Sequence, residues 1–405
     1  MTTASPTPTA LASSTPPPAR RTLSQRLLVR SLVGGLTVAH GAVHLIGAAA
    51  GLGLAQVDAL DVAPAAGLVW LAAGLLVIAA GVGLLAGRRR WWALGAVGVV
   101  LSQVLLVTDW THAAAGTVAN VILLAAVVHG WSAEGPRSLR TRYRTGAEAA
   151  VATLTSTAVL TEADLAALPA QVAGYLRRTG AVGQPRVRGF RARISGRIRG
   201  GPDQPWMAFT GEQVNTFGAA PTRHFWIDAT MRGVPVDVLH VLADGHATMR
   251  VVLCSIVPMV DAAGPEMDRA ETVTLFNDLC LLAPAGLVDA PVTWTPIGDR
   301  SVHGTYTHGE HTVGADLIFD DRGDLVDFVS DDRLRASADG SSFTPTRWST
   351  PVGQYRTYGE RRLGALGQAV WHADAPEGTF AYLEFVLEEM ATELATGRPA
   401  RAGAA

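Results

Sequence analysis

The chain has 405 residues and a formal net charge of −2; 48% of its residues are hydrophobic and 17% are charged. Residues 1–149 hold eleven arginines against five acidic residues, whereas the rest of the chain holds 22 arginines against 30 acidic residues. An acidic C-terminal part lacks the basic footprint of a nucleic-acid-binding domain, so we expect no nucleic-acid partner. A chain of this length predicts more than one domain.

The N-terminal third predicts a tail followed by a membrane module. Residues 1–25 open with Thr, Ser, Pro and Ala without periodicity, which is typical of a disordered tail. A helix of about 20 apolar residues crosses a hydrocarbon core of about 30 Å. We therefore expect residues 26–131 to form a four-span transmembrane helical module. Its apolar stretches contain no Asp, Glu or Arg and cover residues 31–53, 66–86, 91–107 and 113–130.

The arginines that flank these stretches predict their orientation. They lie before the first stretch, between the second and third, and after the fourth, while the other two connections contain none. By the positive-inside rule, we expect a multi-pass protein of the cell membrane with cytoplasmic N- and C-termini. The alternative for the first stretch is a cleaved signal peptide, although its apolar run exceeds the usual h-region of about 7–15 residues.

Four polar side chains within the spans form a predicted membrane polar cluster: His40, His44, Gln103 and Asn120. Polar groups in hydrocarbon usually point into a helix bundle. The simpler interpretation is interhelical hydrogen bonding, worth about 0.6 kcal/mol per contact. The alternative is a pocket for haem, a metal or protons. Two histidines on adjacent turns of one helix cannot bracket one haem iron, so the sequence predicts no cofactor and no metal.

After the fourth span, the sequence predicts a linker, a soluble domain and a short tail. Residues 132–160 are polar and rich in arginine, which suggests a juxtamembrane linker. Residues 161–395 should form a soluble α+β domain, and residues 396–405 a disordered tail. The soluble domain opens with a helix that we expect to start at Thr161 and to end before Gly180.

Beyond residue 180, the apolar pattern alternates with period two, as it does over residues 191–198. One helix interrupts this pattern at residues 268–284, where Asp268 and Glu271 resemble a capping box and Pro284 ends the helix. This order predicts a domain dominated by a curved antiparallel β-sheet. The expected strands cover residues 206–217, 224–231, 234–242, 247–257, 292–297, 302–307, 312–319, 325–330, 344–348, 354–359, 369–372 and 380–390.

Candidate chemistry in the soluble domain is sparse. Glu271 and Asp278 share a polar stripe on the interrupting helix, which is either a solvated face or a pair for acid/base work. Arg333 follows two aspartates, either as an ion pair in a turn or as a ligand clamp. His308 and His311 bracket a predicted hairpin turn, where an exposed turn is a simpler interpretation than a metal site. No nucleophile elbow, P-loop or dinucleotide fingerprint is present.

Aromatic residues in or beside the predicted strands are candidates for lining an apolar cavity, since such rings usually point to a core or a ligand. Together with the charged candidates they make up the predicted ligand-binding set. Its members are Trp206, Trp226, Glu271, Asp278, Trp294, Arg333, Trp348, Tyr355 and Trp371.

Several segments resemble a family catalogued as a domain of unknown function, number 6544. In the soluble part they are residues 271–284, Trp294, Phe319, residues 332–333, residues 348–351, Tyr355 and Trp371; in the membrane part they are residues 44–47, 91–92, 102–103, Trp110 and residues 116–120. Residues 112–115 depart from the pattern, because relatives tend to carry a charged stretch after the tryptophan. The resemblance implies no activity.

The most economical functional hypothesis is binding. A curved sheet offers a concave apolar surface for a lipid or another apolar small molecule, and the bilayer beside it is a lipid source; this step rests on analogy between folds. One alternative is a membrane-associated enzyme that uses the acids of the helix at residues 268–284. Another is a protein-docking platform. The sequence leaves enzymatic activity, ligand identity and oligomeric state open.

Overall fold

The computed structural model describes residues 20–57, 62–155, 158–392, 394 and 400–401. The predicted tails, residues 1–25 and 396–405, lie mostly outside these residues; residues 20–25 are part of a helix, and residues 400–401 form a short strand. The described chain divides into two compact units, one made of helices up to Arg142 and one that begins at Tyr143. We describe each unit separately.

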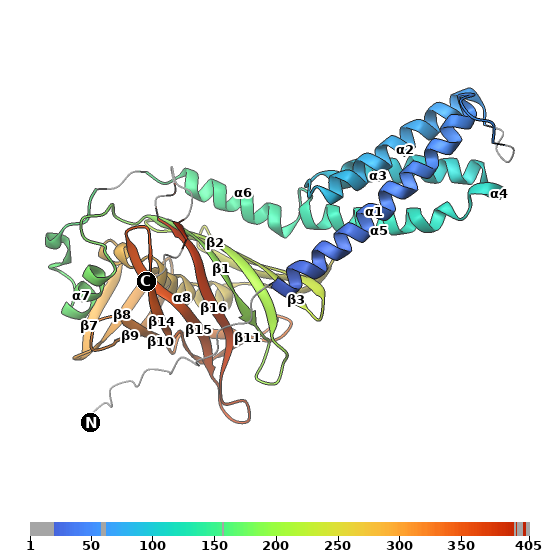
Figure 1. Ribbon diagram of the computed structural model, residues 1–405. Helices are drawn as coiled ribbons and strands as arrows, with labels where there is room; N and C mark the ends of the chain where they lie inside the picture. The colour runs from blue at the N-terminus through green and yellow to red at the C-terminus, as the bar shows by residue number, and fades with distance from the viewer. Residues whose placement is uncertain (1–19, 58–61, 156–157, 393, 395–399, 402–405) are drawn as a thin grey trace. The chain divides into compact units, whose positions relative to one another are not determined.

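The first unit contains four long helices and one short one (Figure 1). Helix α1 packs on α2, α2 on α3, α3 on α5, and α5 on α1. Glycines allow the closest of these approaches, because a Cβ on Gly41 would lie 2.8 Å from Ile78 Cγ1 and 3.0 Å from the Gly74 carbonyl oxygen. The helices are α1 (Arg20–Gly51), α2 (Pro64–Leu85), α3 (Trp91–Thr108), α4 (Trp110–Ala113) and α5 (Gly116–Glu134).

Four helical segments are long and apolar enough to cross a membrane. Their outer side chains include many exposed leucines and valines, whereas the buried side chains include Ala73, Val77 and Leu123. An apolar exterior around a packed interior is what a bilayer as solvent favours. The candidate spans are Leu27–Gly51, Pro64–Leu85, Trp91–Thr108 and Gly116–Ala152.

The second unit begins with helices that flank a large sheet. Helix α6 (Leu139–Ala152) packs on strand β3, where Tyr143 stacks on Trp226 at a ring separation of 6.5 Å. A 3₁₀ turn, η1 (Glu162–Leu165), and helix α7 (Ala170–Arg178) follow. The predicted single helix is therefore interrupted, because Pro169 caps α7 and cannot continue the preceding turn. Thr161 does form a capping box with Asp164.

The sheet is antiparallel and holds fifteen strands in the order β6-β5-β4-β3-β2-β1-β16-β15-β13-β10-β9-β8-β7, with β14 paired to β15 and β17 to β16. Its strands are β1 (Gly189–Ile198), β2 (Met207–Thr216), β3 (Thr222–Met231), β4 (Val234–Ala243), β5 (His246–Leu253), β6 (Val257–Ala263), β7 (Val292–Gly298), β8 (Ser301–His308), β9 (His311–Phe319), β10 (Leu325–Ser330), β13 (Arg347–Ser349), β14 (Val352–Tyr358), β15 (Arg361–His372), β16 (Thr379–Ala391) and β17 (Ala400–Arg401).

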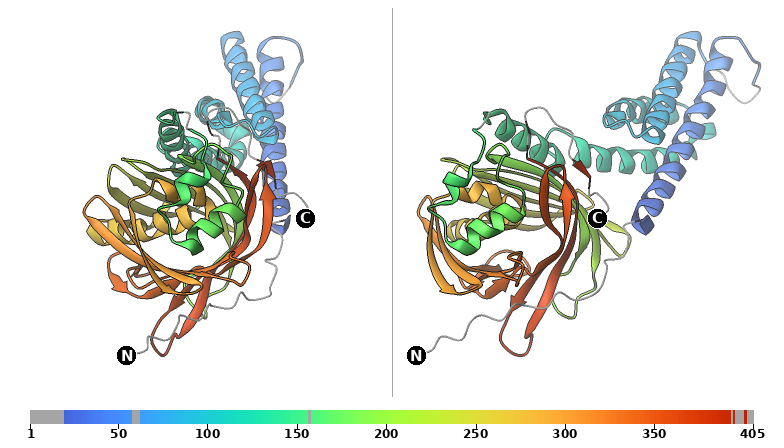
Figure 2. Two further views of the ribbon diagram at one scale, coloured as in Figure 1. Left: turned by 90° about the vertical axis from the view of Figure 1, so that its left-hand side faces the viewer. Right: turned by 60° about the vertical axis from the view of Figure 1, so that its left-hand side comes forward.

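Helix α8 (Pro265–Leu282), followed by the turn η2 (Pro284–Val288), lies against one face of this sheet (Figure 2). It contacts β5 and β6 near one end of the strand order and β9 and β10 near the other. Strands lie about 4.8 Å apart, so a flat sheet could not bring both ends to one helix. The sheet wraps around α8, and Phe276 and Leu275 at the middle of the helix are fully buried in the main core.

A separate two-stranded hairpin, β11 (Leu334–Ala336) with β12 (Phe343–Pro345), leaves the sheet between β10 and β13. It contacts α8, and its turn reaches β6, where a Cβ on Gly340 would lie 2.7 Å from Val260 Cγ1. The hairpin therefore bridges from the middle of the strand order to its β6 edge, across the face that carries α8.

Three further details of the predicted elements are wrong. The expected strand at residues 344–348 is split between β12 of the hairpin, which ends at Pro345, and β13 of the main sheet, which begins at Arg347. Residues 247–257 form two strands with a turn between them, in which Cys254 and Ser255 adopt positive φ angles that a continuous strand cannot contain. Asp268 is not the cap of α8; the cap is Gly264, and the Asp268 carboxylate instead accepts a hydrogen bond from the Ala247 backbone at 2.5 Å.

Candidate functional site

Arg223 on β3 is buried against α8 and joins the two acids of that helix. Its Nη1 donates to Glu271 Oε2 at 2.8 Å, and its Nε donates to Asp278 Oδ2 at 2.7 Å. Glu271 and Asp278 lie seven residues apart, close to two helical turns, so both face the strand. The polar stripe of α8 is thus buried against the sheet, and its interpretation as a solvated face is wrong.

Strand β2 supplies two further donors to Asp278. Gln213 Nε2 lies 2.7 Å and Asn215 Nδ2 3.0 Å from Asp278 Oδ2. Asn215 is directly opposite Arg223 in the β2–β3 register, and Gln213 is two residues away on the same face. Three donors on one oxygen satisfy the buried charge of Asp278 on this side.

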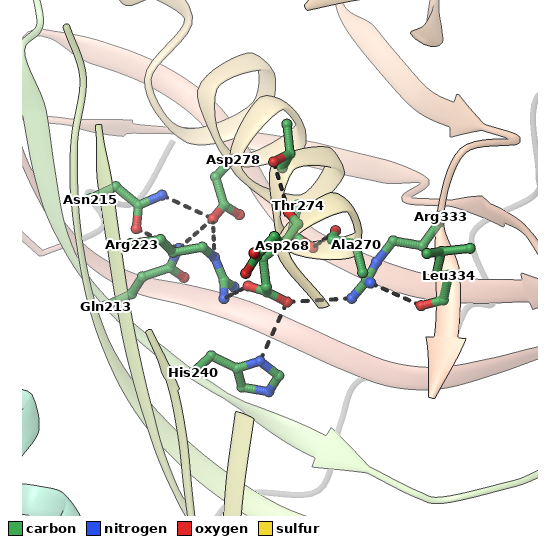
Figure 3. Close-up of polar contacts among 12 residues, drawn as sticks. Gln213, Asn215, Arg223, His240, Asp268, Ala270, Thr274, Asp278, Arg333 and Leu334 are labelled. Atoms are coloured by element: carbon green, nitrogen blue, oxygen red, sulfur yellow. Dashed lines mark hydrogen bonds and ion pairs between the residues drawn. The ribbon is translucent and has the colours of Figure 1, made fainter. Parts of the chain in front are cut away.

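Glu271 is less completely satisfied. Its Oε1 lies 3.5 Å from His240 Nδ1 and 3.5 Å from Arg333 Nη2 (Figure 3). Within the described residues, three buried atoms here have no hydrogen bond: Glu271 Oε1, His240 Nδ1 and Arg333 Nε. Burial alone would raise the pKa of Glu271, but the charge of Arg223, with His240 and Arg333, holds that pKa well below its usual value. The site therefore holds an ionised carboxylate whose Oε1 is contacted by His240 and Arg333 only at ion-pair distance.

Aromatic rings surround the Arg333 guanidinium. Its Cζ lies 5.6 Å from the ring centre of Trp348 and 5.8 Å from that of Trp371. Trp371 in turn stacks on Tyr382 at 5.4 Å. Cation–π contacts of this kind stabilise a desolvated cation. The guanidinium of Arg333 thus lies against aromatic rings and close to the Glu271 carboxylate.

The base of the β11–β12 hairpin holds Arg333 in this position. Arg333 immediately precedes β11, and its Nη1 donates to the Leu334 carbonyl oxygen at 3.1 Å. The neighbouring Asp332 accepts a hydrogen bond from the Gly314 backbone at 2.6 Å and pairs with Arg269 of α8. Two adjacent residues at the base of the hairpin, Asp332 and Arg333, therefore contact Arg269 and Glu271 of α8.

The structure brings five of the predicted ligand-binding residues together, namely Glu271, Asp278, Arg333, Trp348 and Trp371. We call these five, together with Arg223, His240 and Tyr382, the α8 charged cluster. It lies where α8, the sheet and the β11–β12 hairpin meet.

The other four aromatic candidates lie elsewhere. Trp206 is stacked by Arg197 and Arg199 next to the start of β2. Trp226 points to the opposite face of β3 from Arg223, as an odd separation along a strand requires, and packs on α6. The remaining two candidates are Trp294, which packs on Phe276 at 6.4 Å, and Tyr355, which donates to the Leu325 carbonyl oxygen at 2.7 Å.

Arg223, His240 and Tyr382 are members of the cluster that sequence reasoning missed. A weak signal existed for Asn215, the neighbour of Arg223 and a polar residue within the expected strand at residues 206–217, whereas Arg223 itself lies one residue before the expected strand at residues 224–231. His240 and Tyr382 had no distinguishing signal, since their place in the cluster depends on how the hairpins β3–β4 and β15–β16 pack in three dimensions.

The predicted membrane polar cluster also comes together, and Ser102 belongs to it. His40 Nε2 lies 2.8 Å from Asn120 Oδ1, and His44 Nε2 lies 2.8 Å from Ser102 Oγ. Asn120 Nδ2 donates to Gln103 Oε1 at 3.0 Å. These contacts connect α1, α3 and α5 through uncharged groups.

Metal-binding geometry is not found in the described part of the chain, where no group of three or more His, Cys, Asp or Glu side chains could hold an ion. His308 and His311 pair across the β8–β9 turn as register partners. Cys254 and Cys280 are free thiols, and only Cys280 is fully buried.

A model of the family of unknown function DUF6544 matches residues 158–385, which is more than half of the chain. The chain belongs to this family. The match covers the sheet from before α7 to within β16 and includes every member of the α8 charged cluster. No protein with a curated description matches the chain.

Two solved structures are similar at 10% sequence identity. One is described as a putative outer membrane lipoprotein-sorting protein domain from Vibrio parahaemolyticus; its TM-score is 0.31, covering 52% of this chain and 87% of that one. The other is a DUF1329 family protein from Desulfovibrio piger, with a TM-score of 0.36, covering 56% of this chain and 94% of that one. Similarity at this level supports no inference about function.

Proposed function

We propose that this chain is an integral membrane protein whose sheet domain binds a lipid or another apolar ligand beside the α8 charged cluster. The observation that carries the proposal is the length of the contacts of Glu271 Oε1, which meets His240 and Arg333 only at 3.5 Å although all three side chains are largely buried. Buried polar groups usually form shorter hydrogen bonds, so long contacts of this kind favour a place where another molecule binds.

Partly exposed apolar side chains adjoin these atoms. Met249 is directly opposite His240 in the β4–β5 register, and Val251 and Leu253 continue the same face of β5. All three pack against the main core yet remain only half-buried. A few placed polar groups within a mostly apolar lining are typical of small-molecule sites.

The paired acids favour binding over acid/base chemistry. A general acid needs a pKa near the working pH, but the pKa of Glu271 is held far below it, chiefly by Arg223. Asp278 is occupied by three donors. The enzyme hypothesis based on the acids of α8 is therefore the weaker one.

We further propose that the four candidate spans cross the cell membrane with the sheet domain in the cytoplasm. The support is the eleven arginines on one side of the spans and none in the two opposite connections. A reporter fused after Ala405 should be active only in its cytoplasmic form. Activity of a reporter that works only outside the cytoplasm would overturn this orientation.

Photo-crosslinking tests the binding proposal. The full chain in nanodiscs is exposed to a diazirine-labelled C16 lipid probe, and labelled peptides are mapped by mass spectrometry. We expect saturable labelling on β5 and β13. Met249→Trp should reduce it several-fold by filling the space beside His240, whereas Met259→Trp, at a side chain that is 52% exposed, should not.

Labelling confined to the four helices would contradict the binding proposal. The same result, combined with capture of a defined protein partner by the sheet domain, would favour the docking-platform hypothesis instead.

A further inference from the structure

Arginines from separate parts of the chain meet at one end of the helical unit. Arg30 of α1 reaches the loop between α2 and α3, where its Nη1 lies 3.2 Å from the position that a Cβ on Gly87 would take. From the same loop, Arg89 Nε lies 4.0 Å from Glu134 Oε2 at the end of α5. Arg140 Nη1 lies 2.8 Å from the other carboxylate oxygen of Glu134. The end of the bundle therefore carries one continuous polar surface.

This surface has a large excess of positive charge. Its cations, which we call the arginine end, are Arg30, Arg88, Arg89, Arg90, Arg137 and Arg140. Within residues 20–57 and 62–142, the acidic residues are Glu134, which belongs to this surface, and Asp109, which follows the opposite end of the 18-residue helix α3. Six arginines against one carboxylate leave a formal charge of +5. The side chain of Arg89 is 63% exposed even though it faces Glu134.

Tryptophans place the arginine end at the depth of lipid head groups. Trp131, three residues before Glu134 on α5, is 47% exposed. Trp92, in the first turn of α3, packs on α5, where a Cβ on Gly130 would lie 3.2 Å from Trp92 Cβ. Tryptophan is enriched at the boundary between hydrocarbon and water. Three residues of helix span about 4.5 Å, so the arginines begin just outside this boundary.

The chemistry of the arginine end matches a phosphodiester. A guanidinium donates two parallel hydrogen bonds to phosphate oxygens, and it is less strongly hydrated than an ammonium group. One carboxylate cannot neutralise six such groups. A zwitterionic head group brings its own cation, which competes for its phosphate and is repelled by the arginines. An anionic head group brings none, so it gains the full attraction.

We propose that the arginine end binds the head groups of anionic phospholipids, of the phosphatidylglycerol type, in preference to zwitterionic ones. The phosphate lies among the loop at residues 88–90, Arg30 and Arg140, while the acyl chains lie along the apolar outer faces of the helices. This inference rests on the proposed membrane insertion, but it does not depend on ligand binding by the sheet domain. It adds to the orientation of the spans a defined set of lipids held by the folded protein.

Native mass spectrometry of the full chain in detergent tests the proposal. Phosphatidylglycerol and phosphatidylcholine with identical acyl chains are added in equal amounts, and bound lipids are counted. We expect phosphatidylglycerol to bind at about tenfold lower concentration, since each arginine near an anionic lipid contributes about fivefold. Replacing Arg88, Arg89 and Arg90 together by glutamine should bring its binding close to that of phosphatidylcholine. All three side chains are exposed, so this variant should fold normally.

The matched control replaces Arg300, Arg322 and Arg347 by glutamine. These arginines are exposed on the sheet domain, so the net charge changes equally while the lipid preference should persist. Equal binding of the two lipids by the wild type, or the same loss in both variants, overturns the inference. Displacement of phosphatidylglycerol by millimolar inorganic phosphate also overturns it, because the surface would then bind phosphate without a lipid.

These outcomes leave the proposed function standing, since membrane insertion is measured separately. Release of the chain from cell membranes by alkaline carbonate would overturn insertion and this inference together. Retention in carbonate without a lipid preference would overturn this inference alone.

Discussion

The membrane polar cluster of the helical unit and the α8 charged cluster of the sheet unit are both buried, but they are built from different kinds of group. The helical unit uses only uncharged groups, in which His40 and His44 reach Asn120 and Ser102 at 2.8 Å. The sheet unit uses ionised groups, in which Arg223 joins Glu271 and Asp278. The first cluster links three helices, while the second links one helix to a sheet and a hairpin.

The difference suggests a rule for separating packing from binding. The polar side chains of the helical unit direct their hydrogen bonds to one another, which stabilises one arrangement of helices. In the α8 charged cluster, Glu271 Oε1 meets His240 and Arg333 only at 3.5 Å, which is longer than an ordinary hydrogen bond. Long contacts leave buried polar groups incompletely satisfied, which is costly, so such a site is suited to a molecule that supplies shorter ones.

The largest expected effect comes from removing the cation shared by the acids of α8. Arg223→Met should destabilise the sheet domain by about 3–5 kcal/mol, because it leaves two buried carboxylates without their main partner. Denaturant titration followed by tryptophan fluorescence measures this loss.

Arg335→Gln is the control for that experiment, since a surface ion pair with Glu377 contributes about 1 kcal/mol or less. A loss from Arg223→Met no larger than that of the control would mean that charge pairing does not distinguish the two clusters.

A second ionic cluster in the same domain has only short contacts. It therefore tests whether a buried charge alone, without long contacts like those of Glu271, stabilises the fold. Asp324 receives bidentate contacts from both Arg178 and Arg362 at 2.6–2.9 Å. Burial opposes ionisation, but hydrogen bonds from these arginines lower the pKa of Asp324 to about 2. Asp324→Asn should cost about 2 kcal/mol at neutral pH and leave lipid labelling unchanged.

The pH dependence of this effect follows from the depressed pKa. An unfolded aspartate has a pKa of about 3.9, so the stabilisation is complete above that value and is lost as the pH falls through about 2. The stability difference between wild type and Asp324→Asn should shrink over this window. A difference independent of pH from 5 to 2 would show that ionisation of Asp324 contributes nothing.

The smallest effect is expected in the helical unit. Asn120→Leu removes the contacts to His40 and Gln103 and should destabilise the bundle by about 1 kcal/mol, because such hydrogen bonds in membranes are individually weak. Unfolding in mixed micelles measures the change, with Val121→Ala at an exposed helix position as control. A loss of unfolding free energy as large as that of Arg223→Met would contradict the proposed difference between the two clusters.

Local patterns predicted most elements but not their assembly. Alternation of apolar residues located most strands, and the apolar stretches located the four long helices. The turn that divides β5 from β6 escaped because it contains Cys254 and Ser255 at positive φ instead of the glycine that signals such turns.

Only some residues of the candidate site could be predicted from the sequence, because local patterns do not show which elements pack together. Glu271 and Asp278 are visible because they recur on one helix, and Arg333 because it follows two aspartates. Their partner Arg223 comes from β3, and His240 and Tyr382 come from β4 and β16; local patterns do not show which of these strands pack against α8. The burial of the acids could not be read from α8 alone, since its polar stripe looks the same whether a solvent or a sheet covers it.

The pairing of β1 with β16 has a consequence for biosynthesis. Arg191 pairs with Ala391, so the middle of the sheet joins the beginning and the end of the domain. As the ribosome extends the chain, β1 to β6 and α8 emerge while one side of β1 is still an open edge, and exposed edges readily pair with other chains. The free edge of β1 is covered only once β16 has been synthesised, after the other strands from β2 to β15. Synthesis of β16 is thus the step that joins the two halves of the open sheet, β6 to β1 and β15 to β7, and removes an aggregation-prone edge from the nascent chain.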